Sequence, residues 1–492
     1  MALSYFDESF ESLGYWWTPG HMEDARPGYL RYDPARGIRL TLLGPFKPQS
    51  VKSFPESPRY PILLGRVTSS PLDTFVTLTD CTYAGGRGVF FSIGTEEFTV
   101  NRAYFGAHLE GDDAFRFDAA TLFLDYLEHW ATESALEMSV EFEHDIPVKH
   151  EVRYGKKEMP RAVVGPRTVE LDLLRELPLD LTRTVTLSET PCFNVRFESA
   201  EHVDTILRDT IFPLQNLSSL ASDHRTRIRG LQLSRGAAGN ATRVHLLFQQ
   251  IPGPTGPVPK RLWAEQMLVT SRDVPMERLL TAWLPFAAEH RDLCDLYFSV
   301  MYSPTLLSDA AFFMLAQVAE GYHRDQIGGT EQPDDAFQST RSAVVAAAPQ
   351  EHQKWLDRKL GLANELSLKT RLHALVKPDR ATLKAIFGDT AAFVDLAADT
   401  RNYMAHRIVE LQKKAATGIT LHQLTERLRL LVKACFLREL GLTSDERRTI
   451  LTRHVTFDRI VRAPQSSPRK QTRTKSSAPA HEKTSVGPRR GK

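Results

Sequence analysis

Hydrophobic and polar residues alternate along the first half of the chain in the way that half-buried β-strands require. Every second side chain of a strand points to the same face, so an alternating sequence gives one apolar and one polar face. A helical pattern interrupts the strands at residues 206–219. The predicted strands are residues 29–33, 38–42, 75–79, 140–152 and 182–187, then 243–250 and 261–270 on either side of a Pro/Gly loop at 252–257. Residues 1–272 are therefore predicted to form a β-rich, sandwich-like domain.

After Pro275 the apolar residues recur at intervals of three and four, which is the spacing of a packed α-helix. Helices are predicted at residues 276–301, 307–324, 350–375, 390–411 and 421–435, with a last helix after Thr443. Gly441 can end the fifth helix in the left-handed conformation, and Thr443 with Glu446 forms a capping box for the last one. Residues 273–458 are thus predicted to form an all-α domain, and the whole chain a multidomain α+β protein.

Length and composition favour a soluble globular protein of two or three domains. The chain has 492 residues, of which 42% are hydrophobic and 25% charged. It contains no apolar run long enough to span a bilayer, and Asp7, Glu8 and Glu11 stand where a signal peptide would need basic and then apolar residues. We therefore expect a cytoplasmic protein without a membrane partner.

The cysteines indicate neither a disulfide framework nor a zinc site. Cys81, Cys192, Cys294 and Cys435 lie far apart in the sequence, without the close spacing that metal-binding pairs show. We expect them to be reduced, mostly buried thiols, and we expect no metal or other cofactor.

Charge is distributed unevenly along the chain. Residues 463–492 contain eight Lys or Arg residues and one acidic residue, a net charge of +7, so the remainder carries −5 of the overall +2. Because residues 459–492 have almost nothing apolar to bury, they are predicted to form a disordered basic tail. The tail could attract RNA phosphates, or it could be a solvated end without a function of its own.

The most informative polar cluster lies within the predicted helix 390–411. At about 100° per residue, Asn402 and His406 point away from the buried stripe, and Arg401 lies on its flank. The stripe predicted to be buried comprises Phe393, Ala397, Met404, Ile408 and Leu411. The Arg/His spacing by itself recurs elsewhere, as at Arg102 and His108, so the evidence is the context: a long amphipathic helix and an amide directly after the arginine.

These residues carry a resemblance to a known family. Residues 401–406 resemble the Arg-Asn-x-x-x-His signature of HEPN domains, and Gln317-Val318-Ala319-Glu320-Gly321-Tyr322-His323-Arg324 matches the Gln-x-x-Glu-x-Tyr-His-Arg run of the ApeA-like HEPN domain. Gly14-Tyr15-Trp16-Trp17 with its following Pro-Gly, Gly28-Tyr29-Leu30, and Ile38-Arg39-Leu40 running to Gly44 resemble the ApeA N-terminal domain. The whole chain therefore resembles the ApeA family of bacterial anti-phage proteins.

The resemblance implies a metal-independent endoribonuclease that acts in abortive infection. The implied substrate is RNA, in particular tRNA cleaved in its anticodon loop, where unpaired bases can be read. HEPN nucleases pair two copies of the motif across a two-fold axis, so a homodimer through the HEPN domain is expected. The N-terminal domain would sense or regulate in response to an unknown phage-derived trigger.

Within this reading the motif residues have separate chemical tasks. We hypothesise that His406 transfers protons as general base or acid, because an imidazole titrates near neutrality. Arg401 would grip phosphate oxygens with its permanently charged fork. Asn402 would orient either the imidazole one turn on or the RNA. Glu320, Tyr322 and His323 are supporting candidates, for which a catalytic role and a polar network between helices both stay open.

Two other classes of function stay open at this point. The helical domain could be a noncatalytic HEPN module that binds a nucleotide or a partner protein as a scaffold. The β-rich half could be a carbohydrate-binding β-sandwich, although Trp16 and Trp17 are expected in the core rather than on a sugar-stacking platform. Glu141 and Glu143, on one face of a strand, could mimic a glycosidase carboxylate pair, but exposed acids on one face are more often solvated surface.

Overall fold

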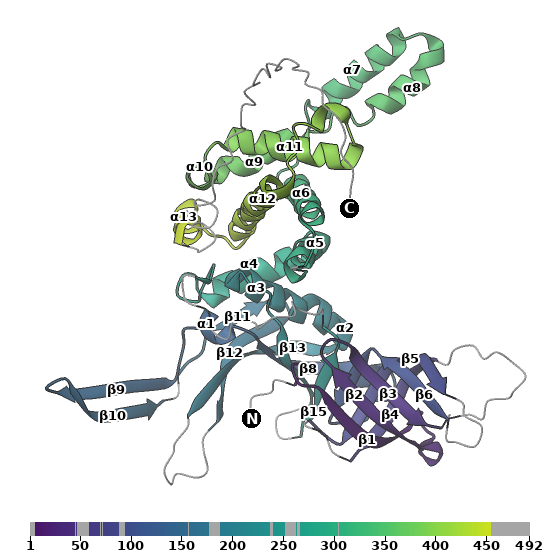
Figure 1. Ribbon diagram of the computed structural model, residues 1–492, viewed down its shortest axis with the longest axis vertical. Helices are drawn as coiled ribbons and strands as arrows, with labels where there is room; N and C mark the ends of the chain where they lie inside the picture. The colour runs from purple at the N-terminus through teal and green to yellow at the C-terminus, as the bar shows by residue number, and fades with distance from the viewer. Residues whose placement is uncertain are drawn as a thin grey trace, which may run out of the picture.

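The computed structural model shows a β-rich region and a helical region stacked along the long axis of the molecule (Figure 1). It describes residues 5–44, 46, 59–68, 70, 72–87, 94–155, 157–176, 187–236, 240–250, 262, 266–303 and 305–453. The predicted tail at 459–492, the Pro/Gly loop at 252–257 and all but the last residue of the predicted strand 182–187 lie outside this part of the chain. The β-rich and all-α predictions are confirmed.

The first part of the β-rich region is a closed barrel. Its strands follow each other in the order β5-β4-β1-β2-β3-β6, and β6 pairs back with β5. They are β1 (Phe10–Trp17), β2 (Arg26–Asp33), β3 (Gly37–Leu43), β4 (Arg59–Val67), β5 (Phe75–Arg87) and β6 (Thr95–Val100). β5 can serve both ends because it is long: its first half pairs with β4 and its second half, after a register shift between Tyr83 and Gly85, pairs with β6.

Side chains from the predicted strands fill this barrel. Trp16 on β1 is fully buried against Gly65 of β4, where any larger residue would collide with the indole ring. Trp17 is buried as well, so both tryptophans belong to the core and neither offers an exposed sugar-stacking face. The sequence predicted a sandwich-like arrangement. The strands instead form one continuous sheet that closes on itself at one end.

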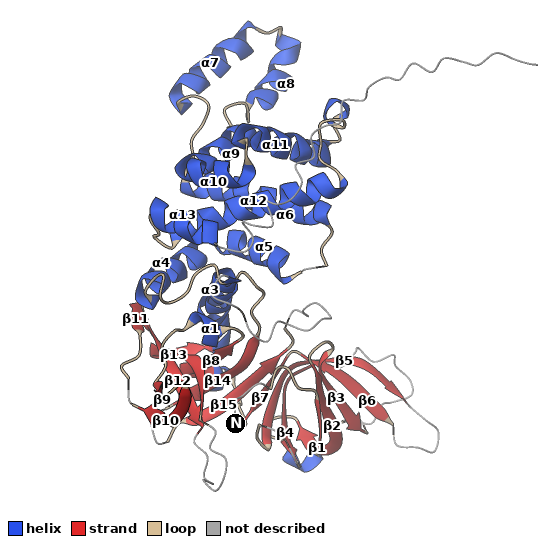
Figure 2. Ribbon diagram, turned by 60° about the vertical axis from the view of Figure 1, so that its left-hand side comes forward, coloured by secondary structure: helices blue, strands red, loops and turns tan. Residues whose placement is uncertain are grey.

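The rest of that sheet is open, in the order β11-β12-β13-β8-β14-β15-β7 before it joins β5. Its strands are β7 (Arg102–Phe105), β8 (Arg116–Leu124), β11 (Arg161–Val164), β12 (Arg167–Glu176), β13 (Ser188–His202), β14 (Ile228–Arg235) and β15 (Thr242–Phe248). Helices α1 (Leu127–Trp130) and α3 (Phe212–Ser222) lie on the side that faces the helical region (Figure 2), and α2 (Val203–Ile206) leads into α3 through a π-helical turn at Leu207–Ile211. The predicted helix 206–219 is therefore confirmed.

A separate two-stranded hairpin of β9 (Leu136–Glu143) and β10 (Ile146–Tyr154) projects from the open sheet (Figure 1). Glu141 and Glu143 lie on its charged face, where Glu141 accepts a hydrogen bond from Lys149 Nζ at 2.7 Å. Glu141, Glu143 and Lys149 are all exposed, which fits solvated surface rather than an enclosed carboxylate pair. Glu141 and Glu143 therefore do not form the enclosed pair of carboxylates that a glycosidase would need.

The helical region consists of short and long helices stacked in layers. They are α4 (Met276–Glu289), α5 (Arg291–Tyr302), α6 (Ser308–Gln326), α7 (Asp334–Ala347), α8 (Gln350–Leu360), α9 (Leu368–Val376), α10 (Arg380–Phe387), α11 (Thr390–His406), α12 (Gly418–Glu439) and α13 (Ser444–Arg453). In the described chain no helix is both long and apolar enough to cross a membrane. The four cysteines are free and buried, and burial raises the pKa of the Cys192 and Cys294 thiols to about 12.

Several predicted elements differ from the structure, among them the strand expected at 140–152, which is the hairpin of β9 and β10. The helix expected at 276–301 is two helices that meet at His290, and the one expected at 350–375 is α8 and α9 with a loop between them. The strand expected at 261–270 is wrong for its described residues: Leu268 and Val269 lie in an irregular segment whose amides donate to Ala221 O. The capping box is confirmed, since Thr443 N donates to Glu446 Oε2 at 2.6 Å.

Helices α6 and α12 form the centre of the helical region, and buried side chains continue from there to the barrel. Trp283 of α4 donates its indole N–H to Pro213 O of α3 at 2.8 Å. This hydrogen bond attaches α4, the first helix of the helical region, to a helix of the β-rich region. The boundary that the sequence places at residues 272–273 stays a prediction, because α4 packs on both regions.

A buried ion pair attaches the last helix. Asp379 Oδ1 accepts hydrogen bonds from Arg447 of α13, at 3.0 Å from Nε and 2.8 Å from Nη2, and both side chains are buried. Asp379→Ala would leave the guanidinium buried without its partner, so we expect the free energy of unfolding to fall by about 3–5 kcal/mol. Asp395→Ala, which breaks an exposed pair with Lys369, is the matched control, with an expected loss of about 0–1 kcal/mol. Urea denaturation measures both, and equal losses would contradict a structural role for Asp379.

Candidate active site on helix α11

The motif occupies the last turns of α11. Asp389 caps the start of this helix, since its Oδ1 accepts hydrogen bonds from Ala391 N at 2.9 Å and Ala392 N at 3.2 Å. The helix ends at His406 because Arg407 takes a left-handed conformation (φ 52°). The predicted extension to Leu411 is therefore wrong, and Ile408 and Leu411 do not continue the buried stripe. Phe393 and Ala397 are buried as predicted.

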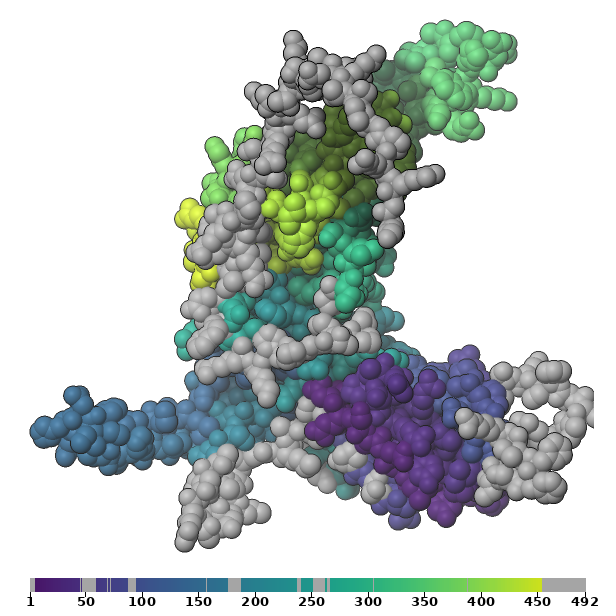
Figure 3. All heavy atoms as spheres, viewed as in Figure 1, coloured from purple at the N-terminus to yellow at the C-terminus, as the bar shows by residue number. Residues whose placement is uncertain are grey.

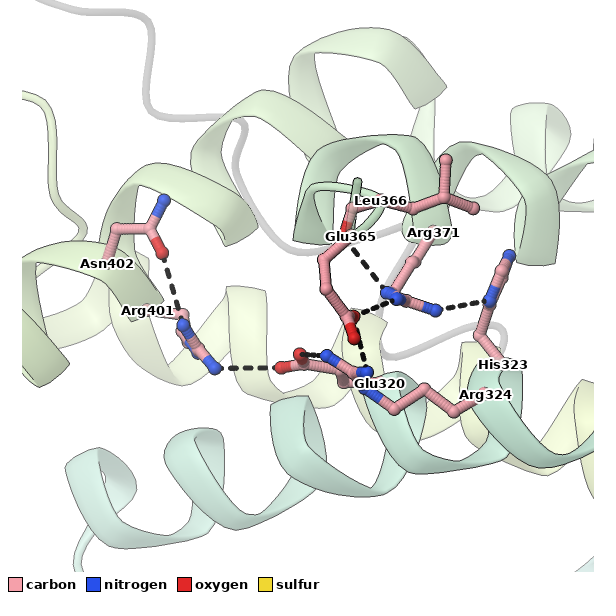
Figure 4. A network of polar contacts seen from close by, with 8 residues as sticks. All are labelled: Glu320, His323, Arg324, Glu365, Leu366, Arg371, Arg401 and Asn402. Carbon is pink, nitrogen blue, oxygen red and sulfur yellow. Dashed lines mark hydrogen bonds and ion pairs between the residues drawn. The ribbon is translucent and has the colours of Figure 1, made fainter. Parts of the chain in front are cut away.

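Arg401 points toward α6 and forms an ion pair with Glu320. Its Nη2 donates to Glu320 Oε2 at 2.8 Å, and both side chains are mostly buried (Figure 4). The Arg401 Nε–H has no hydrogen-bond acceptor among the described residues. A carboxylate held this way fixes the guanidinium in one direction and leaves part of its donor capacity unused.

Glu320 continues into a chain of alternating charges. Its Oε1 accepts from Arg324 Nη2 at 3.2 Å, Arg324 Nη1 donates to Glu365 Oε2 at 2.5 Å, and Arg371 Nη2 donates to the same carboxylate oxygen at 2.9 Å (Figure 4). The sequence reasoning missed Glu365 and Arg371. Arg324 stands four residues after Glu320 in the sequence, a spacing at which opposite charges on a helix meet.

His323 and Tyr322 point away from the motif. His323 is 1% exposed, and because an arginine can only donate, its Nδ1 accepts from Arg371 Nη1 at 3.1 Å. Burial, together with Arg371 and Arg324, lowers the pKa of His323, so this imidazole is neutral. Tyr322 donates to Glu439 of α12, and burial raises the pKa of its phenol. Both contacts join helices, which favours a structural role.

Asn402 and His406 lie one turn apart on the outer face of α11. Asn402 Oδ1 accepts a hydrogen bond of 3.4 Å from Arg401 Nη1, which orients the amide toward the guanidinium (Figure 4). His406 is exposed, and no hydrogen bond or ion pair to it is found within the described part of the chain. The structure thus joins Arg401, Asn402 and Glu320, and it leaves His406 at the surface, free to contact another molecule.

An open cavity of about 490 Å³ lies directly beside this helix end. Tyr403, Met404 and Arg407 line one side, and the first turns of α6 and α12 line the other. Three apolar side chains within two residues of its lining are highly exposed: Leu307 (77%), Val409 (74%) and Ile419 (67%). So much exposed apolar surface next to a cavity is typical of a contact with another protein.

One group of side chains in the described part of the chain could hold a metal ion, and it lies in the β-rich region. It comprises His21, Glu23 and Asp24, which are exposed between β1 and β2. Carboxylates of this kind are common on protein surfaces.

Two protein-family models match the chain. Residues 11–283 match the ApeA N-terminal domain 1, and residues 313–446 match the Apea-like HEPN domain. The second match contains Glu320, the charge network and the whole motif. Neither a curated protein nor a solved structure matches the chain.

Proposed function

The chain belongs to the ApeA family, and from this premise we propose that it is a metal-independent endoribonuclease effector of bacterial anti-phage defence. The observation that carries the proposal is the end of α11. Arg401 is aimed by Glu320, Asn402 contacts Arg401, and His406 stands exposed one turn further on. A cation, an amide and an exposed imidazole on one helix are the groups that metal-free cleavage of a phosphodiester needs.

In the proposed reaction an imidazole accepts the proton of a ribose 2′-hydroxyl. The 2′-oxygen attacks the adjacent phosphorus, the bond from phosphorus to the 5′-oxygen breaks, and the leaving oxygen takes up a proton from a second imidazolium. The products are a 2′,3′-cyclic phosphate and a 5′-hydroxyl. The Arg401 guanidinium stabilises the charge that grows on the phosphate oxygens.

The second imidazole would come from a second copy of the chain. Helix α11 supplies one histidine, whereas both proton transfers benefit from one. Leu307, Val409 and Ile419 are exposed, and each lies within two residues of the lining of the cavity beside this helix end. A two-fold axis there would bury these side chains on both copies and bring the two motifs together.

Val409→Asp with Ile419→Asp is expected to weaken self-association by about 100-fold or more. Each buried apolar side chain contributes about 1.5–3 kcal/mol, and each substitution occurs twice in a symmetric interface. Val163→Asp replaces an exposed residue of β11; it is the control and should leave the dimer intact. Light scattering reports the mass, and a strictly monomeric wild-type protein that cleaves RNA would contradict the proposal.

The finer parts of the proposal follow from the family. The target would be tRNA in its anticodon loop, the protein would act in the cytoplasm, and the β-rich region would respond to a phage-derived trigger. Cleavage of such a target stops translation, which accounts for abortive infection. These assignments rest on family membership, while the cleavage chemistry rests on the motif.

The direct test is cleavage of RNA by purified full-length protein in the presence of EDTA. We expect fragments that carry a 2′,3′-cyclic phosphate and a 5′-hydroxyl, detected by end-specific ligation before and after phosphatase treatment. Fragments with a 3′-hydroxyl and a 5′-phosphate, or cleavage that EDTA abolishes, would overturn the proposed chemistry. A protein that binds RNA without cutting it would favour the noncatalytic scaffold.

A further inference from the structure

Helices α7 and α8 form an arm that projects from the helical region. Figures 1 and 3 show the arm standing clear of the other helices, at the end where α11 lies. Along α7 only Phe337 is buried, and α8 buries no residue at all. At 1.5 Å per residue α7 is about 21 Å long. Because the arm contributes little to the core, its exposed side chains are better explained by contact with another molecule.

The outward face of α8 carries cations around an exposed aromatic ring. Trp355 is 54% exposed, and Lys354, Arg358 and Lys359 beside it are exposed too. None of these three cations has an ion pair among the described residues. Helix α8 also carries two acids: Asp357 pairs with Arg341 of α7 at 2.8 Å, and Glu351 is exposed and lies near His352. Within α8 three cations stand against these two acids, so the helix carries a net charge of +1 beside the exposed tryptophan.

This combination suits single-stranded nucleic acid. Lys and Arg neutralise phosphates, and a base can stack on an indole ring whatever its identity. A half-exposed tryptophan costs hydration free energy that a stacked base would recover. We propose that the outer face of α8 binds the unpaired part of the RNA substrate, an inference that rests on the proposed nuclease function and assigns a surface to its substrate.

The base of the arm is connected to the motif. Glu365, which follows α8, accepts hydrogen bonds from Arg324 and Arg371, and Arg324 shares Glu320 with Arg401. An RNA strand held on α8 would therefore be anchored to the same rigid network that positions the phosphate clamp. This arrangement lets the arm hold the substrate while α11 acts on it.

The test compares arm variants in full-length protein that also carries His406→Ala, so that the RNA stays intact. The triple variant Lys354→Gln/Arg358→Gln/Lys359→Gln is expected to bind a fluorescein-labelled RNA hairpin at least about tenfold more weakly. It should also reduce the slope of log affinity against log salt by about 2, at about 0.7 per lost phosphate contact. Trp355→Ala is expected to weaken binding about tenfold by loss of stacking, with the salt slope unchanged.

Two matched controls accompany these variants. Lys377→Gln/Arg380→Gln/Lys384→Gln removes three exposed cations at α10 and its preceding turn, and Phe142→Ala removes an exposed ring from β9. Each should change affinity less than about twofold. Arm variants that bind RNA as well as their controls, or that only change the mass of the protein, would overturn the inference. The nuclease proposal is overturned as well if the full-length His406→Ala protein does not bind RNA and the wild-type protein does not cleave it.

Discussion

Replacing His406 by alanine is expected to slow RNA cleavage by about 10²- to 10⁴-fold, the contribution typical of a positioned general acid or base. The substitution removes the exposed imidazole that ends α11. Because His406 is exposed and has no hydrogen bond or ion pair in the described chain, we expect the free energy of unfolding to change by no more than about 0.5 kcal/mol. Loss of activity without loss of stability would identify a chemical role.

The control for His406 is another exposed histidine of the same region. His373→Ala on α9 removes an imidazole that is also exposed and lies outside the motif. It should cleave RNA at the wild-type rate. Single-turnover rates with saturating enzyme compare the two variants, and equal rates for His406→Ala and wild type would remove His406 from the mechanism.

Replacing Arg401 by alanine is expected to lower the cleavage rate by about 10²- to 10³-fold, as for loss of one charge-stabilising donor. Arg401→Lys should recover less than about tenfold of this loss. Lysine keeps the charge, but its compact ammonium cannot hold Glu320 and present a planar fork to a phosphate at the same time.

Arg324→Ala separates the clamp from the network around it. This variant removes the other cation that contacts Glu320 but keeps Arg401, so we expect a loss of less than about tenfold. If Arg324→Ala and Arg401→Ala were equally inactive, the network as a whole rather than the motif arginine would be required. An Arg401→Ala protein with wild-type activity would contradict the clamp.

Local pattern was sufficient for most elements of the fold. Strands such as β2 and β3 and helices such as α6 and α12 were visible because alternation and helical spacing are written in neighbouring residues. Closure of the barrel was not visible, because it depends on β5 pairing with β4, β6 and β7 at different points along its length. The break at His290 was missed for a different reason, since no glycine marks it.

The motif was identified from the sequence, but its surroundings were not. Arg401 was expected on the flank of the helix, where its side chain could turn either way. Glu320 selects the direction from 81 residues away in the sequence, and no local pattern encodes such a pair. The end of α11 at His406 was missed because a left-handed arginine at position 407 leaves no compositional sign.

The central claim is that the motif at the end of α11 cuts RNA, and sequencing of RNA ends tests it most directly. RNA from cells that express wild-type protein and from cells that express the His406→Ala variant would be ligated through 2′,3′-cyclic phosphates and compared. New ends at defined positions, in tRNA above all, are expected with wild type and absent with the variant. The same ends in both samples, or none in either while the wild type is toxic to the cells, would contradict it.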